Sequence, residues 1–446
     1  MTFVRKHIFS AFLALGLLLA CQPEQVVIVP GPKPEPGPVN DTAAVDPPTP
    51  VPPEPAGPII PDEMDALPCV YIETPGRVAV RSKTIWVELA TIKITGDEGK
   101  VLYQDDSLKI RGRGNSTWWN YPKKPYYIKL DHQADFYGTG KSKKWVLLAN
   151  WMDRTLLRNQ VAFEASRRTS IEWTPYGRFV ELYLNGEHLG NYWLGEKINV
   201  EGSKFEAEYL FTFDTSDSNE RDFFSTGTYR ANVRQWNCPV EVKYPDRDDY
   251  DYDTDPSKFR PILTAAEQTL KTMTDAIAAG NFSDVIDIDS FCDWYLVHEL
   301  CYNMEPNHPK SCFFHWRGGK MYAGPVWDFD WNTFTPNHNT LDISNSLWYS
   351  RLLKNSAFKA RLKERWAELK PSFETLPDYI DEQADIIWES EWNNNQMWPC
   401  YPNPVTEDGS GMVNHDENLS YQEALDRMKD ALRSRISALD KRIPAL

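Results

Sequence analysis

The sequence lacks an excess of positive charge. Its 446 residues include 48 Lys and Arg against 64 Asp and Glu, which gives a formal net charge of −16. Because binding to nucleic-acid phosphates needs a positive surface, this balance argues against a general nucleic-acid-binding protein. A local basic strip is still able to hold a nucleotide.

The N-terminal apolar run is too short to cross a bilayer. Residues 8–20 form an uncharged, mostly apolar stretch of thirteen residues, whereas a membrane-spanning helix needs about twenty. The stretch follows Arg5 and Lys6 and ends in the letters LLAC, as in the lipobox that bacterial lipoproteins carry. We therefore expect residues 1–20 to be a lipoprotein signal peptide and Cys21 to carry the lipid anchor of an exported, membrane-anchored protein. An ordinary signal peptide that ends near a Cys is the alternative.

Cysteine is scarce, and its spacing fits no metal site. The chain has seven Cys, with no CxxC pair and no zinc pattern. Export permits disulfides, but buried free thiols explain the sequence equally well. Both interpretations stay open for the cysteines outside the signal, which are Cys69, Cys238, Cys292, Cys301, Cys312 and Cys400.

Proline concentrates directly after the signal. Residues 22–62 hold 14 of the 33 prolines, a composition that favours extended polyproline II over helix or sheet. We expect residues 21–62 to be a linker that holds a folded domain away from the membrane. A proline-rich motif for a partner protein is the alternative.

The remaining chain divides into a strand-rich part and a helix-rich part, without an internal repeat. Residues 63–200 read mainly as strands, including a hairpin with its turn at Asn185-Gly186, and one helix over 153–168 with Asp153 as its cap. Residues 201–446 read mainly as helices, with two short strands at 312–316 and 322–327. This order predicts an α+β fold with a strand-rich N-terminal lobe and a helix-rich C-terminal lobe. Clefts between lobes are common ligand sites.

The last helix shows the clearest periodicity. Its apolar residues recur at intervals of three and four, which predicts one apolar face packed on the domain rather than a coiled coil with a partner. These residues are Leu425, Met428, Leu432, Ile436, Leu439 and Ile443.

A glycine-rich basic turn is the first candidate site. Glycines allow backbone N–H groups to approach an anion closely, and nearby hydroxyl groups and cations strengthen such binding. A surface turn with solvated lysines is the alternative. The candidate residues in RGRGNST (111–117) and PKKPYYIKL (122–130) are Arg113, Asn115, Ser116, Lys124 and Lys129.

The second candidate is PVWDFDW at 325–331. On a strand, Asp328 and Asp330 share one face, and the aromatic residues lie on the other. Buried carboxylates are costly unless they hold a metal or a proton, and Mg²⁺ typically takes one or two carboxylates plus phosphate oxygens. Structural aspartates that cap turns are the alternative.

The third candidate is the loop at 303–310. Its two prolines enforce an irregular segment between a helix and a strand, and such loops often carry catalytic groups. Glu305 is able to act as a base there, whereas His308 is better explained as a structural histidine.

Five segments together resemble the CotH kinase family, the spore-coat-protein-H-like atypical protein kinases. They follow one another in the family's order across most of residues 108–331. The segments are RGRGNSTWWNYPKKPYYIKL (111–130), KKWVLLANWMDRTLLRNQVA (143–162), LNGEHLGNYWLGEKI (184–198), VEVKYPD (240–246) and GPVWDFDW (324–331).

This resemblance implies a two-lobed kinase-like fold that binds ATP with Mg²⁺ or Mn²⁺ and phosphorylates protein. It also implies that Lys124 or Lys129 contacts phosphates and that Glu196, with Lys197 beside it, lies near the nucleotide. Asp328 resembles the metal-binding Asp of kinases, with Asp330 close by.

The sequence departs from the family at the catalytic position. Glu305 aligns with the family's catalytic Asp, and a misplacement of about 1 Å can cost two orders of magnitude in rate. The Asn that holds a second metal in kinases is replaced by Lys310-Ser311, so that Asn307 or Asn332 would have to substitute. An exported protein also meets little ATP. One alternative is therefore a pseudokinase-like surface module that binds protein or glycan. Another is a glycoside hydrolase, which needs two carboxyl groups about 5–9.5 Å apart.

Overall fold

The computed structural model describes residues 58–200, 204–214, 223–231, 234–250, 254–336, 338–400 and 414–446. The expected signal peptide, the lipidation site Cys21 and most of the linker lie outside these residues. Within the described part of the chain, no helix combines the length and apolar character needed to cross a membrane.

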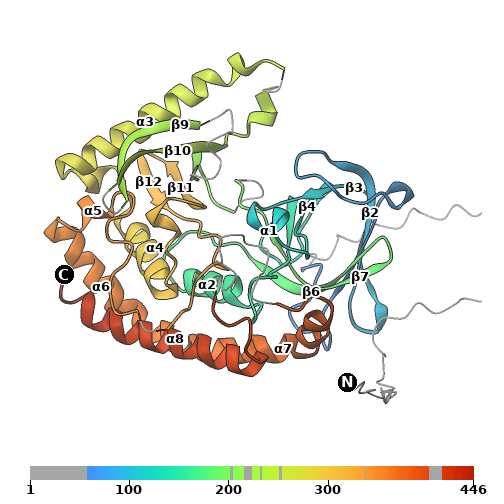
Figure 1. The fold of residues 1–446 in the computed structure, drawn as a ribbon. Coiled ribbons are helices and arrows are strands. Elements are labelled where there is room, and N and C mark those ends of the chain that lie inside the picture. The colour runs from blue at the N-terminus through green and yellow to red at the C-terminus, as the bar shows by residue number, and fades with distance from the viewer. Residues whose placement is uncertain are drawn as a thin grey trace, which may run out of the picture.

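The N-terminal part forms a closed seven-stranded barrel (Figure 1). Its neighbour order is β1-β2-β3-β4-β5-β7-β6, and parallel pairing of β1 with β6 closes the ring. Closure leaves no unpaired strand edge. The interior is filled with apolar side chains, among them Ile72, Ile128 and Trp145. The strands are β1 Cys69–Glu73, β2 Val87–Thr95, β3 Val101–Gly112, β4 Tyr126–Ala134, β5 Ser142–Leu148, β6 Gly177–Leu184 and β7 Glu187–Glu196.

The predicted hairpin is confirmed as β6 and β7. The two turn residues, Asn185 and Gly186, have φ angles of 55° and 79°. Tight hairpin turns need such left-handed conformations, which Asn and Gly adopt at low cost. The Asn185-Gly186 pair therefore correctly predicted both strands and the turn that joins them.

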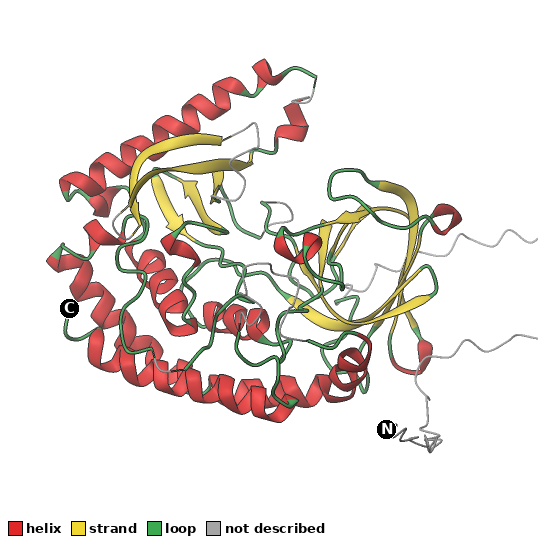
Figure 2. Cartoon of the chain, viewed as in Figure 1, coloured by secondary structure: helices red, strands yellow, loops and turns green. Residues whose placement is uncertain are grey.

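A second sheet follows the barrel, in the order β12-β11-β8-β10-β9 (Figure 2). The strand expected at 312–316 is β11, whereas the strand expected at 322–327 ends at Ala323 as β12. Three further strands, which the sequence did not indicate, complete the sheet: β8 pairs with β11, and β10 lies between β8 and β9. The pairing of β8 with β11 joins segments about a hundred residues apart, which no local pattern reveals. The strands are β8 Tyr209–Phe213, β9 Phe223–Ala231, β10 Arg234–Tyr244, β11 Cys312–Arg317 and β12 Lys320–Ala323.

The helices surround this second sheet and extend towards the barrel (Figure 1). The final helix, α8, begins with a capping box between Ser420 and Glu423, which supports its start. Its predicted apolar face is buried in the main core, as expected. The helices are α1 Ser116–Trp119, α2 Arg158–Arg167, α3 Arg260–Ala279, α4 Ile288–Cys301, α5 Tyr349–Leu352, α6 Ser356–Phe373, α7 Leu376–Met397 and α8 Tyr421–Arg442.

The α+β class is confirmed, whereas the two-lobed kinase-like arrangement stays a prediction.

Five cysteines lie among the described residues as free thiols, so they form no disulfides with one another. They are Cys69, Cys292, Cys301, Cys312 and Cys400.

A buried lysine connects the barrel to α7. The Lys123 ammonium donates to the Ala149 carbonyl at 3.0 Å and to Asn394 Oδ1 at 2.7 Å, and it also donates to the Asn191 carbonyl. Only 1% of Lys123 is exposed, so water does not replace these bonds. One side chain thus connects the β5 end, β7 and α7.

Replacing this lysine is expected to destabilise the fold. Lys123→Met keeps the apolar stem but leaves three buried acceptors without a donor, which predicts a loss of about 3 kcal/mol in the free energy of unfolding. Urea denaturation measures this loss, with the exposed Lys100→Met as the control. Equal midpoints for both variants would contradict the role given to Lys123.

Candidate active site

A cavity of about 770 Å³ lies between the barrel and the second sheet. The barrel contributes the glycine-rich turn after β3 and the residues that follow β7. The second sheet contributes Thr212 of β8 and Lys243 of β10, and the loops around β11 and β12 supply acidic residues. The cavity is thus assembled from segments far apart in the sequence.

Three carboxyl groups meet at this cavity. Glu305 lies in a short 3-10 helix, Glu305–Asn307, between α4 and β11, while Asp328 and Asp330 follow β12. Burial raises the pKa of Glu305 well above its usual range, and the charges of both aspartates raise it further. Burial likewise raises the pKa of Asp330, and Asp328 adds to the shift. The three groups repel one another as anions and therefore favour a proton or a cation between them.

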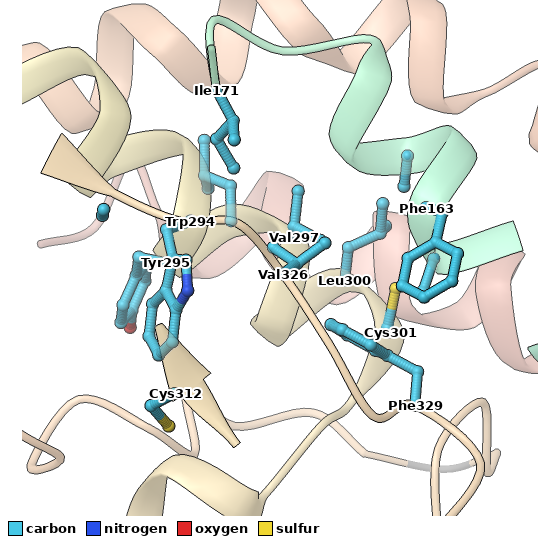
Figure 3. Close-up of a cluster of buried hydrophobic side chains, with 14 of the residues drawn as sticks. Phe163, Ile171, Trp294, Tyr295, Val297, Leu300, Cys301, Cys312, Val326 and Phe329 are labelled. Atoms are coloured by element: carbon cyan, nitrogen blue, oxygen red, sulfur yellow. The ribbon is translucent and has the colours of Figure 1, made fainter. Parts of the chain in front are cut away.

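The acidic segment does not form a strand, so the predicted alternation of faces is wrong. Strand β12 ends at Ala323, and Asp328 has a left-handed φ of 67°. Trp327 lines the cavity together with both aspartates, whereas Phe329 is fully buried in the core. Figure 3 shows Phe329 lying near Cys301 within that buried cluster. This aromatic anchor holds the segment while the aspartates face the cavity.

Polar contacts fix the backbone around Asp328. Asn159 Oδ1, on the first turn of α2, accepts from the Phe329 amide at 2.8 Å, and Asn303 Nδ2 donates to the Asp328 carbonyl at 3.1 Å. Ser311 Oγ donates to Asp328 Oδ2 at 3.0 Å. These bonds support the left-handed conformation that a non-glycine residue adopts only at a cost.

A buried arginine, Arg158, also stabilises the segment that follows Asp328. The Arg158 guanidinium donates to Asp153 Oδ1 at 2.5 Å and to the Thr333 carbonyl at 3.2 Å, and its Nη2 lies 2.7 Å from Asp416 Oδ2. Burial alone lowers the pKa of Arg158, but Asp416 and Asp153 raise it above its usual value. The guanidinium therefore stays charged and joins three segments.

The helix predicted over 153–168 begins later than expected. It starts at Arg158, and Asp153 is not its N-cap residue. Asp153 Oδ2 nevertheless accepts from the Arg158 amide at 2.8 Å, across a tight turn. Asp153 thus accepts a hydrogen bond from the first amide of the helix, although it lies further from that amide along the chain than an N-cap residue does.

Two basic side chains line the cavity. Arg113 lies near the carboxyl groups, and Lys197 lies on the opposite wall. The Arg113 guanidinium lies 5.6 Å from the centre of the Trp327 ring. Burial lowers the pKa of Arg113, and Asp328 and Asp330 oppose that shift. Burial, aided by the like charges of Lys243 and Lys144, lowers the pKa of Lys197 to about 7. An anion next to Lys197 would relieve this unfavourable arrangement.

The glycine-rich turn borders the cavity, as the sequence predicted. Gly114 has a φ of 80°, which suits glycine. Asn115 and Ser116 both line the cavity, and Asn115 Oδ1 accepts from Lys83 at 2.6 Å. The structure therefore brings Arg113, Asn115 and Ser116 to the same cavity as the acidic residues.

Three other predicted residues are not among those that line the cavity. The Lys124 ammonium donates to the Trp118 carbonyl at 2.6 Å and to the Tyr121 carbonyl, and so stabilises the turn. Lys129 is partly exposed on β4, between strands β3 and β5. Glu196 is fully buried and pairs with Lys204 at 3.0 Å. This arrangement gives no support to phosphate contact by either lysine.

The sequence analysis did not single out the basic residues of the cavity wall next to the second sheet. Lys243 and Arg247 lie on or after β10, a strand that local patterns did not reveal. Lys197, by contrast, was expected near the nucleotide together with Glu196, on the resemblance to the family. Its position at the end of a strong hairpin strand was the available signal for a buried functional lysine.

The carboxylates suit a divalent cation that shares its ligands with phosphate. In the searched, described residues, no group of three or more His, Cys, Asp or Glu is placed to hold a metal ion by itself. Mg²⁺ needs no such group, because it typically binds one or two carboxylates and completes its shell with water and phosphate oxygens. Among the residues that the structure describes, buried Glu305 Oε2 has no hydrogen-bond partner, which fits a site that acquires a cation or substrate.

These features define an α+β protein whose cavity combines buried carboxyl groups with basic side chains and a glycine-rich turn. The family model described as CotH kinase protein matches residues 110–439. The chain therefore belongs to the CotH kinase family, as its sequence motifs suggested. No curated protein matches the chain.

Lys197 is expected to bind phosphate. Lys197→Met should weaken binding of ATP with Mg²⁺ by about tenfold or more at slightly acidic pH, because a charge-assisted hydrogen bond contributes about 1.5–3 kcal/mol. Titration with a fluorescent ATP analogue measures the affinity. Lys129→Met is the matched control and should bind as the wild type does. Loss of affinity in the control alone would reverse the assignment.

The contribution of Lys197 should also depend on pH. Its pKa in the nucleotide-free protein is lowered to about 7, so the ammonium is charged below that pH and neutral above it. The affinity ratio between wild type and Lys197→Met should therefore be largest near about pH 6 and decline towards about pH 9. Taking the ratio cancels the titration of ATP itself. A ratio that rises with pH would contradict the lowered pKa.

Proposed function

We propose that this CotH-family protein transfers the γ-phosphoryl group of ATP to hydroxyl groups of protein substrates, with Mg²⁺ or Mn²⁺. The observation that carries the proposal is the buried Glu305 Oε2, which has no hydrogen-bond partner in the described ranges and lies beside Asp328 and Asp330 in a cavity that also has basic walls. Phosphoryl transfer needs mainly positioning and electrostatic stabilisation, and this arrangement supplies both.

Asp328 and Asp330 would hold the divalent cation. The cation supplies charge neutralisation to the phosphates when it is bound. Ser311 and Asn303 orient Asp328 for this purpose. Because the two aspartates supply few ligands, phosphate oxygens and water complete the shell.

The basic side chains would bind the polyphosphate. Arg113 lies close enough to Asp328 and Asp330 for their charges to act on its pKa, so it would contact the same phosphates as the cation. Lys197 lies on the wall near β10. The backbone of the turn around Gly114 allows close approach of phosphate oxygens.

Glu305 would accept the proton of the substrate hydroxyl. The hydroxyl oxygen forms a bond to the γ-phosphorus, the bond from that phosphorus to the β,γ-bridging oxygen breaks, and ADP leaves. Burial and the neighbouring aspartates raise the pKa of Glu305. Cations bound to those aspartates would lower it again, so that the carboxylate would be available as a base. Glu replaces the Asp that the family resemblance implies here, and the short 3-10 helix sets its reach.

We also propose that the described domain has the two-lobed arrangement of a kinase, with the barrel and the second sheet on opposite sides of the cavity. The sequence of residues 1–62 supports export and anchoring through a lipid on Cys21. A surface-bound kinase of this kind would act on proteins outside the cytoplasm.

Intact mass tests the activity directly. The full chain incubated with ATP and Mn²⁺ should gain phosphate on itself or on added protein, and Asp328→Asn and Glu305→Gln should each reduce the rate at least about a hundredfold, because each removes a reacting or metal-binding group. Asp430→Asn, an exposed aspartate on α8, should act as the wild type does.

The same experiment separates the competing function. Metal-dependent ATP binding without any mass gain would identify a pseudokinase-like module that binds protein or glycan. Absence of both binding and mass gain would overturn the proposal entirely.

A further inference from the structure

Two buried polar atoms on the cavity wall have no hydrogen-bond partner within the described part of the chain. They are Trp151 Nε1, a donor, and Glu417 Oε2, an acceptor. Both side chains line the cavity, with exposed fractions of only 9% for Trp151 and 8% for Glu417. Buried polar groups in folded proteins almost always have partners, so a donor and an acceptor left unpaired in one cavity indicate a ligand that offers both functions.

The surroundings of these atoms are aromatic and acidic. The Tyr121 ring stacks on Trp151 with centroids 4.7 Å apart. Burial raises the pKa of Tyr121 to about 12, and Asp330, Cys400 and Glu417 add to the shift. Asp330 and Glu417 thus bring negative charge close to Tyr121. A polyphosphate is repelled here and is attracted by Lys197 and Lys243 near β10.

This end is also connected to the proposed metal-binding loop. Glu417 Oε1 accepts from the Asn414 amide at 3.3 Å, and Asn414 Nδ2 donates to the Asp330 carbonyl at 2.9 Å. Glu417 is thus linked to the loop that carries Asp330 through one intervening residue, Asn414. A group bound to Glu417 would lie beside the phosphate-binding centre, where a phosphate acceptor has to be.

We propose that Trp151 and Glu417 form an acceptor subsite that binds a main-chain peptide group next to the hydroxyl to be phosphorylated. Trp151 Nε1 donates to the peptide carbonyl, and Glu417 Oε2 accepts from a peptide N–H. This inference rests on the proposed function and specifies its substrate: a peptide segment recognised through its backbone. Such recognition tolerates many side chains, because every non-proline residue offers the same donor and acceptor.

Peptide binding tests the subsite without requiring turnover. The probe is a degenerate peptide library with one fixed serine, offered to the full chain with Mn²⁺ and a non-hydrolysable ATP analogue. Trp151→Phe removes the indole N–H but keeps an aromatic ring, and Glu417→Gln removes the charge. Each should weaken peptide binding by about five- to tenfold and leave the affinity for the ATP analogue unchanged. Trp151→Phe removes a hydrogen-bond donor, and Glu417→Gln replaces a charge-assisted hydrogen bond with a neutral one.

Matched controls and a modified library complete the test. Trp392→Phe and Glu389→Gln, both exposed on α7, should bind as the wild type does. A library methylated at the backbone nitrogens beside the serine should bind the wild type weakly and no longer distinguish it from Glu417→Gln.

The subsite is overturned if wild type and both variants bind the library equally, if none of them binds it, or if the variants lose affinity for the ATP analogue. The last result would make this end a nucleobase site. Failure of the proposed phosphotransfer is seen separately, as an absent mass gain in a protein that still binds the peptides.

Discussion

Repulsion among buried carboxyl groups is the constraint on which the site depends. Glu305, Asp328 and Asp330 are close enough for each aspartate to raise the pKa of Glu305. Burying such charges without compensation is costly. The three carboxyl groups therefore need compensating positive charge, and Arg113 supplies only part of it. A divalent cation with an anionic substrate would satisfy the remainder, which is the basis of the proposed phosphate chemistry.

The architecture holds these groups in place from two sides. The barrel positions the glycine-rich turn and Lys197, whereas the loops around β11 and β12 carry the acidic residues. Helix α2 connects the two, because Arg158 and Asn159 on its first turn bind the segment that follows Asp328. Since α2 follows β5 directly in the chain, the barrel and the acidic loop are positioned by one short segment. The rigid placement that catalysis requires thus comes from secondary structure rather than from the loop itself.

Local patterns predicted the features that depend on neighbours in sequence. The hairpin at Asn185-Gly186, the apolar face of α8 and the irregular loop carrying Glu305 all follow from short-range chemistry. Strand β8 was missed because it pairs with β11, about a hundred residues further along the chain. The hairpin of β9 and β10 is local but was also missed, and with it the lysine and arginine of the cavity wall. The family resemblance pointed to Lys124 and Lys129, but only the fold shows that Lys124 bonds to backbone carbonyls of its own turn. Unpaired atoms such as Trp151 Nε1 leave no trace in a sequence.

The most direct test of the central claim is to locate the cation. Crystals of the full chain with Mn²⁺ and a non-hydrolysable ATP analogue would show the metal by its anomalous scattering. We expect one strong anomalous peak within coordination distance of the Asp328 or Asp330 carboxylate and of phosphate oxygens. The polyphosphate should extend towards Arg113 and Lys197. A bound nucleotide whose metal lies away from both aspartates, or a nucleotide bound outside this cavity, would contradict it.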